Sequence, residues 1–193
     1  MLAGGAVTRG SDVFVAWPPG SVAEAEALRR RADEAGVEVG VERPVAADVA
    51  GRAASGGPDG LPRLVVVTLA AAGASWPRHL AGALDVAARL VGSREATRLD
   101  AEAERDGAAL RAVAVSVRFR NGAFAQVLVR AAPVPALTVD AAGVEASAAA
   151  AGTLGDEAVA FVRAVASGQP APFSLDDALA TMRLAERVMA ALR

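Results

Sequence analysis

Apolar runs and one amphipathic stretch alternate near the start of the chain. Residues 12–16 are almost wholly apolar and stop shortly before a Pro-Pro pair. This apolar run predicts a short buried strand, which ends before the prolines because proline cannot donate a ladder hydrogen bond. Ser21, followed three residues later by Glu24, forms a capping box that predicts a helix ending at Gly36. Residues 37–41 predict a second strand, and a strand, helix and strand at this spacing make the two strands parallel neighbours.

The composition changes between residues 46 and 61, where Ala, Gly, Ser, Pro and Asp predict a loop. We place a domain boundary there, which gives one domain at residues 1–60 and a second at residues 61–193. In the second domain, alternating and periodic apolar positions predict strands at 63–69, 96–104, 110–119, 124–130 and 138–139, a turn at 140–143, and helices at 77–91, 156–166 and from Ser174 onwards. Asn121-Gly122 predicts a tight hairpin between two of these strands. We therefore expect an α+β domain, a mostly antiparallel sheet with helices packed on one face.

The amino-acid composition excludes several kinds of chemistry. The chain has 193 residues, of which 53% are hydrophobic, and its net charge of -2 gives no reason to expect nucleic-acid binding. It has no cysteine, which excludes disulfides and thiolate chemistry, and no lysine, which excludes Schiff-base chemistry. No apolar run is long enough for a membrane span or a signal peptide, so we expect a cytoplasmic protein.

Several segments together resemble one enzyme family. They are residues 12–19 and 35–44, the helix segment 84–92, the strand and turn 117–123, and the C-terminal segments 161–170 and 174–178. In order and spacing they are similar to the Gfo/Idh/MocA family, named for glucose–fructose oxidoreductase and inositol dehydrogenase. The resemblance implies an α/β part that is a partial, Rossmann-like βαβ remnant, followed by the family's C-terminal α+β domain.

The resemblance also implies what is altered. In the family a Rossmann domain binds NAD(P) and the C-terminal sheet domain mediates oligomers. A lysine in a Glu-Lys-Pro motif and a histidine–aspartate pair serve hydride and proton transfer. The lysine position is Arg43 here, and the histidine and aspartate positions fall on Gly82 and Arg78. The glycine-rich phosphate turn is missing, so we expect an N-terminally truncated relative that binds no dinucleotide alone.

Each candidate site residue has two interpretations. His79 and Asp85 are the candidate catalytic groups, although a lone histidine is more often structural and Asp85 fits a buried hydrogen bond or salt bridge. Trp17, Pro18, Glu42 and Arg43 are the candidate cofactor contacts, because they follow strands whose carboxyl ends form the usual ligand edge of α/β sheets. The alternative is inherited loop structure, with Trp17 covering the sheet edge. No metal site is expected.

Three functional hypotheses remain open. The first is a non-catalytic subunit that acts by homo-oligomerisation or by association with a full-length oxidoreductase. The second is an NAD(P)-dependent oxidoreductase of a sugar-like or other small substrate, whose cofactor site is completed by a partner chain. The third is a small-ligand-binding or scaffold protein. The sequence names no substrate.

Overall fold

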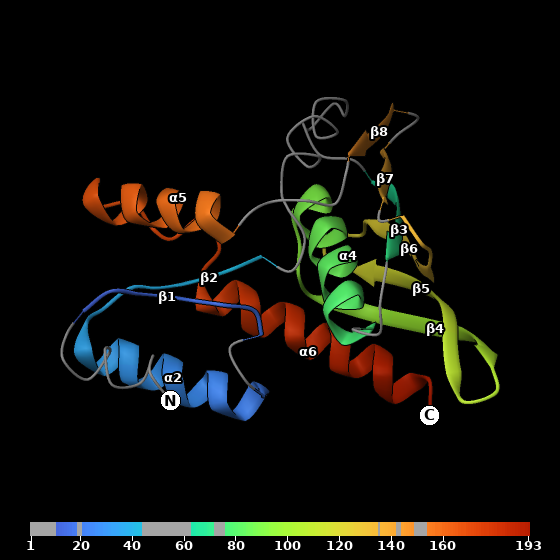
Figure 1. The fold of residues 1–193 in the computed structure, drawn as a ribbon, viewed down its shortest axis with the longest axis horizontal. Helices are drawn as coiled ribbons and strands as arrows, with labels where there is room; N and C mark the ends of the chain where they lie inside the picture. Colours follow the sequence, from blue (N-terminus) through green and yellow to red (C-terminus); the bar gives the residue numbers. More distant parts are fainter. Residues whose placement is uncertain are drawn as a thin grey trace. The chain divides into compact units, whose positions relative to one another are not determined.

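The structure is a computed structural model that describes residues 11–18, 21–43, 63–71, 76–134, 136–141, 144–148 and 154–193 (Figure 1). Two compact units make up the chain, and neither is continuous in sequence. The first unit comprises Met1–Pro44 with Gly152–Arg183, and the second comprises Val45–Ala151 with Leu184–Arg193.

The first unit is built on two parallel strands. Strands β1 (Val13–Val15) and β2 (Val39–Val41) pair in register, with Val13 opposite Val39. Helix α2 (Val22–Ala35) connects them, and the Ser21–Glu24 capping box begins it. Gly36 ends the helix in the left-handed conformation, with φ of 63°. The predicted crossover and its parallel strands are therefore confirmed.

Two further helices complete this unit. Helix α5 (Leu154–Ala166) lies on the opposite side of the strand pair from α2 (Figure 1). Phe161 of α5 packs against Phe14 and lies directly over Gly40, where any side chain would overlap the ring. Helix α6 (Leu175–Ala191) begins at a second capping box, in which Ser174 and Asp177 exchange hydrogen bonds, and only its first part belongs to this unit.

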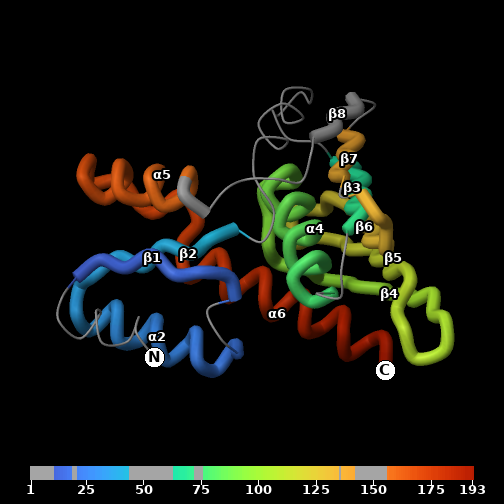
Figure 2. The backbone as a smooth tube through the Cα atoms, viewed as in Figure 1, coloured from blue at the N-terminus to red at the C-terminus, as the bar shows by residue number. Residues whose placement is uncertain are grey.

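The second unit holds a six-stranded sheet in the order β4-β5-β6-β3-β7-β8, and the trace in Figure 2 follows the strands in turn. The strands are β3 (Leu64–Ala71), β4 (Ala96–Asp106), β5 (Ala109–Phe119), β6 (Phe124–Ala131), β7 (Ala136–Ala141) and β8 (Val144–Ala148). Among these six described strands, only β3 and β6 pair in parallel. Helix α4 (Trp76–Val91) covers one face, against which Val67, Val115 and Val127 are buried. This is the α+β arrangement that the sequence predicts.

Several local predictions are confirmed and two need correction. The hairpin at Asn121-Gly122 is present, with Gly122 at φ of 83°. The predicted turn at 140–143 is wrong at its start, because Asp140 belongs to β7, while residues 142 and 143 lie outside the described residues. Strand β8 was not predicted.

The two units are each built from two separate stretches of the chain, whereas the sequence predicts two continuous domains. The boundary predicted at residues 60 and 61 lies outside the described residues and stays a prediction. Residues 152–183, which that division assigns to the second domain, cluster with the N-terminal elements instead. The reason is long-range bonding, such as the hydrogen bond from the Ala171 N–H to the Glu38 carboxylate at 3.0 Å. Among the helices that the structure describes, none is long and apolar enough to cross a membrane.

Candidate functional site

Four of the predicted site residues lie together at the carboxyl ends of β1 and β2. Trp17 and Pro18 follow β1, and Glu42 and Arg43 follow β2. The Glu42 N–H donates to the carbonyl of Val15 at 2.8 Å, and the Glu42 carboxylate accepts the Trp17 N–H at 3.0 Å. Because these bonds join the two strand ends, Glu42 closes the edge of the sheet that α/β proteins commonly use for ligands.

Arg43 ties this edge to two other segments of the first unit. Its backbone N–H donates to the Glu157 carboxylate of α5 at 2.6 Å, and its guanidinium donates to the Pro172 carbonyl at 2.6 Å. The guanidinium carbon also lies 5.9 Å from the centre of the Phe173 ring, within cation–π range. A planar guanidinium that bonds a carbonyl and also lies over a ring is restricted in its orientation.

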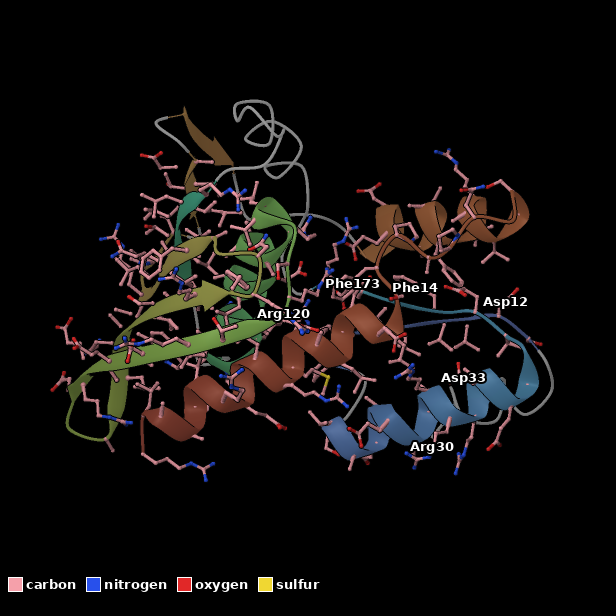
Figure 3. All side chains as sticks on the ribbon, turned by 180° about the vertical axis from the view of Figure 1, so that it is seen from behind. Asp12, Phe14, Arg30, Asp33, Arg120 and Phe173 are labelled. Atoms are coloured by element: carbon pink, nitrogen blue, oxygen red, sulfur yellow. The ribbon has the colours of Figure 1, made fainter. Side chains whose placement is uncertain are left out.

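Aromatic packing fills the space beside Arg43. The buried Trp17 ring lies 6.3 Å from the ring of Phe173, whose side chain is 2% exposed. Phe14 and Phe173 are labelled in Figure 3, both beside the β1–β2 pair. The cavity that remains among Arg43, Phe161 and Phe173 measures about 40 Å³. That volume holds one or two water molecules, whereas ligand pockets measure several hundred Å³.

A wider hollow of about 510 Å³ opens where β1 and β2 begin, at the end opposite Arg43. Asp12, Asp33 and Glu38 are among its lining residues, so its wall is acidic. The C-terminal turn of α2 also contributes to it, and a helix C-terminus carries partial negative charge. A phosphate would be repelled there, and this hollow does not suit a dinucleotide.

The two candidate catalytic residues belong to α4 in the second unit. His79 is half-buried in the first turn, and Asp85 is 1% exposed. Six residues of α-helix separate them by about 9 Å along the axis and turn their side chains to different faces. They do not form an acid–base pair on one face of the helix.

Both oxygens of Asp85 are occupied by arginines. Oδ2 accepts from Nε of Arg89 at 2.9 Å, and Oδ1 accepts from Nη2 of Arg94 at 3.1 Å. These bonds join the last turns of α4 to the segment that leads into β4. The interpretation of Asp85 as a buried salt bridge is therefore confirmed. Arg89 could have been found from its i+4 spacing on the helix, whereas Arg94 lies beyond the helix and carries no such signal.

Within the described ranges, no group of three or more His, Asp or Glu side chains is placed to hold a metal ion. The hydroxyl of Thr181 on α6 is a polar group that the sequence did not single out. Thr181 is 2% exposed, and its Oγ1 has no hydrogen-bond partner in the part of the chain that the structure describes.

No protein-family model matches the sequence, and no curated protein matches it. Solved structures do match the fold. A probable dehydrogenase from Thermotoga maritima superposes with a TM-score of 0.79 at 15% identity, over 99% of this chain and 74% of that one. UDP-N-acetylglucosamine 3-dehydrogenase from Acidithiobacillus ferrooxidans gives 0.78 at 16% identity, over 99% and 73%.

A third structure, scyllo-inositol dehydrogenase from Lactobacillus casei with bound NAD(H) and scyllo-inositol, gives a TM-score of 0.77 at 12% identity, over 98% of this chain and 73% of that one. These matching structures are dehydrogenases, and one of them is an inositol dehydrogenase, which agrees with the family resemblance in the sequence. At these identities the likeness establishes the fold alone, and this chain has the fold of the matching part of these dehydrogenases.

Proposed function

We propose that this protein is a non-catalytic, dehydrogenase-fold subunit that acts by association, with another copy of itself or with a complete oxidoreductase of the same fold. The observation that carries the proposal is the outward face of the six-stranded sheet. Alternate residues of each strand point away from α4, and on β3 and β6 they include the apolar side chains of Leu64, Val66, Phe124 and Leu128.

These four side chains form one patch. Leu64 pairs directly with Phe124, and Val66 and Leu128 follow two and four residues further along the same strands. Leu64 is 52% exposed and Leu128 is 36% exposed. Gln126 lies between Phe124 and Leu128 on β6, opposite Val66, and Arg130 follows on the same face, so the patch mixes apolar and polar side chains as protein interfaces do.

The geometry of the first unit supports the non-catalytic part of the proposal. Arg43, at the position of the family's lysine, is engaged by Pro172 and Phe173, and the cavity beside it is too small for a nicotinamide ring. An arginine also holds its proton near neutral pH and cannot act as an acid or base. Asp85 is engaged by two arginines rather than by a histidine.

Sedimentation equilibrium across a wide dilution range tests the association. We expect the wild-type chain to form a dimer or larger assembly, and Leu128→Glu to lower the mass of that assembly because a carboxylate would be desolvated in the interface. Val162→Glu is the matched control, since Val162 is an apolar residue on α5, 63% exposed and not part of the sheet. Equal effects of the two substitutions, or none, would argue against this face.

The second candidate function is an NAD(P)-dependent oxidoreductase whose cofactor site is completed by a partner chain. Its support is the placement of Glu42 and Arg43 at the carboxyl ends of parallel strands, the usual ligand edge. Similar structures with NAD, such as GenD2 of gentamicin A biosynthesis, add to it. Calorimetric titration with NAD(H) and NADP(H), with the chain alone and with a candidate partner, separates the two functions.

A further inference from the structure

Strand β1 has one edge that β2 does not use. The Val13 N–H donates to the Glu38 carbonyl at 3.0 Å, and the Val15 carbonyl accepts the Glu42 N–H at 2.8 Å. Since the backbone groups of successive strand residues point to opposite edges, the N–H and C=O of Phe14 point away from β2. The same alternation turns Asp12 and Ala16 toward this outer edge.

Within the part of the chain that the structure describes, no strand pairs with the outer edge of β1. By contrast, both edges of β2 are occupied, because its Val41 N–H donates to the Phe173 carbonyl at 2.9 Å on the side away from β1. Among the described residues, the backbone groups of Phe14 at the outer edge of β1 therefore have no strand partner, and the exposed residues Asp12 and Ala16 flank them.

The sequence of β1 protects this edge only by the short length of the strand and by Asp12 at its end. Edge strands in stable monomers commonly carry inward-pointing charges, lysines, prolines or bulges that prevent pairing with another chain. Val13–Val15 is an uninterrupted apolar run, and α2 and α5 lie on either side of the strand pair, as for a strand inside a sheet (Figure 1).

We propose that the outer edge of β1 pairs with β1 of a second copy of this chain, antiparallel and about a two-fold axis through Phe14. This contact goes beyond the sheet face of the proposed function and is separate from it. In this register Phe14 lies opposite its own symmetry mate, and Asp12 lies opposite Ala16 of the second copy. Each of these pairs exchanges both backbone hydrogen bonds, so the two β1–β2 pairs become one four-stranded sheet.

Two features favour a second copy in this register. All three outward residues of each strand are paired, whereas a register shift by two residues, the smallest that keeps outward residues opposite each other, leaves one of them unpaired on each chain. Asp12 meets Ala16 rather than another carboxylate, so the pairing brings no like charges directly opposite each other. The half-buried Phe14 ring, whose centre lies 5.6 Å from that of the tilted Phe161 ring, also gains its symmetry mate as a neighbour.

Cysteine cross-linking tests the register, and the chain is suited to it because it contains no cysteine. In the proposed pairing the Cα atoms of Asp12 and of Ala16 in the second copy are about 5.5 Å apart, within the range of about 4.4–6.8 Å that a disulfide spans. Two copies of Ala16, or two of Asp12, are about 14 Å apart, since four strand residues separate them.

We therefore expect a mixture of the Asp12→Cys and Ala16→Cys proteins to form a disulfide-linked heterodimer on mild oxidation, while each alone stays uncross-linked. An uncross-linked mixture, or equal cross-linking of each variant alone, would overturn the proposal. Running the experiment in the Leu128→Glu background separates it from the proposed function. A cross-link in the Leu128→Glu background would show that the β1 contact forms independently of the sheet face. If no cross-link forms although the wild-type chain is oligomeric, only this inference is refuted.

A proline substitution directly after β1 gives an independent test of the pairing. Ala16→Pro removes an outward N–H without touching the β1–β2 hydrogen bonds, and Ala16→Val keeps that N–H. We expect the proline variant alone to lose slow hydrogen exchange at the Phe14 amide, a protection that dilution of the wild-type chain should also remove. Fast exchange at Phe14 in the concentrated wild-type chain would contradict the pairing.

Discussion

Replacement of Asp85 by alanine tests whether this carboxylate is structural. Asp85 is 1% exposed and bonds Arg89 and Arg94, whose side chains are 16% and 28% exposed. Breaking a fully buried pair typically costs about 3–5 kcal/mol, because a charge is left without its partner. Both guanidinium groups keep some contact with water, so we expect a smaller loss of unfolding free energy, about 2–3 kcal/mol.

Urea denaturation followed by circular dichroism measures this loss. Asp100→Ala is the matched control, since Asp100 bonds Arg98 at 3.0 Å but both side chains are more than half exposed. We expect the control to cost less than about 1 kcal/mol. If the two variants lose equal stability, the buried ion pair does not stabilise the fold, and Asp85 must be explained in another way.

Three further predictions follow from particular contacts. Gly40→Ala should lower the unfolding free energy by about 1–3 kcal/mol, because a Cβ would lie 2.8 Å from Cε2 of Phe161. Adding Phe161→Leu should restore part of this loss. If it restores none, the overlap is not the cause of the loss. Thr181→Val should raise the unfolding free energy by about 1 kcal/mol, seen as a higher urea midpoint, because the buried hydroxyl has no hydrogen-bond partner among the described residues. A loss of stability would show that the hydroxyl has a partner. The Ser21 backbone N–H lowers the pKa of Glu24 below its usual 4.5. The wild-type chain should therefore be more stable than Glu24→Gln above pH 4.5, and this difference should disappear as the pH falls through the lowered pKa. A difference in urea midpoints that persists in strong acid would contradict this.

The elements that could be predicted from the sequence carry their signals locally. Ser21 and Ser174 are each followed three residues later by an acidic residue, and both begin helices as expected. The Asn-Gly pair at residues 121 and 122 joins two strands whose alternation is strong. Strand β8 gave no such signal, because Val144–Ala148 is mostly small residues with weak strand preference and is a strand through its pairing with β7.

The site shows the same division between local and distant information. The burial of Asp85 was predictable from its neighbours on an apolar helix. The role of Arg43 was not, because its partner Pro172 lies 129 residues further along the chain. Local periodicity cannot reveal that a residue after one strand is held by a loop from the other end of the sequence. The interleaving of the two units was hidden for the same reason.

In the proposed function, the segment at Glu42 and Arg43 holds the first unit together instead of binding a nicotinamide cofactor. Isothermal titration calorimetry of the purified chain with NADH and NADPH tests this role. We expect no saturable heat from either dinucleotide. Saturation at micromolar concentration, weakened by Arg43→Met in a variant that stays folded, would contradict it.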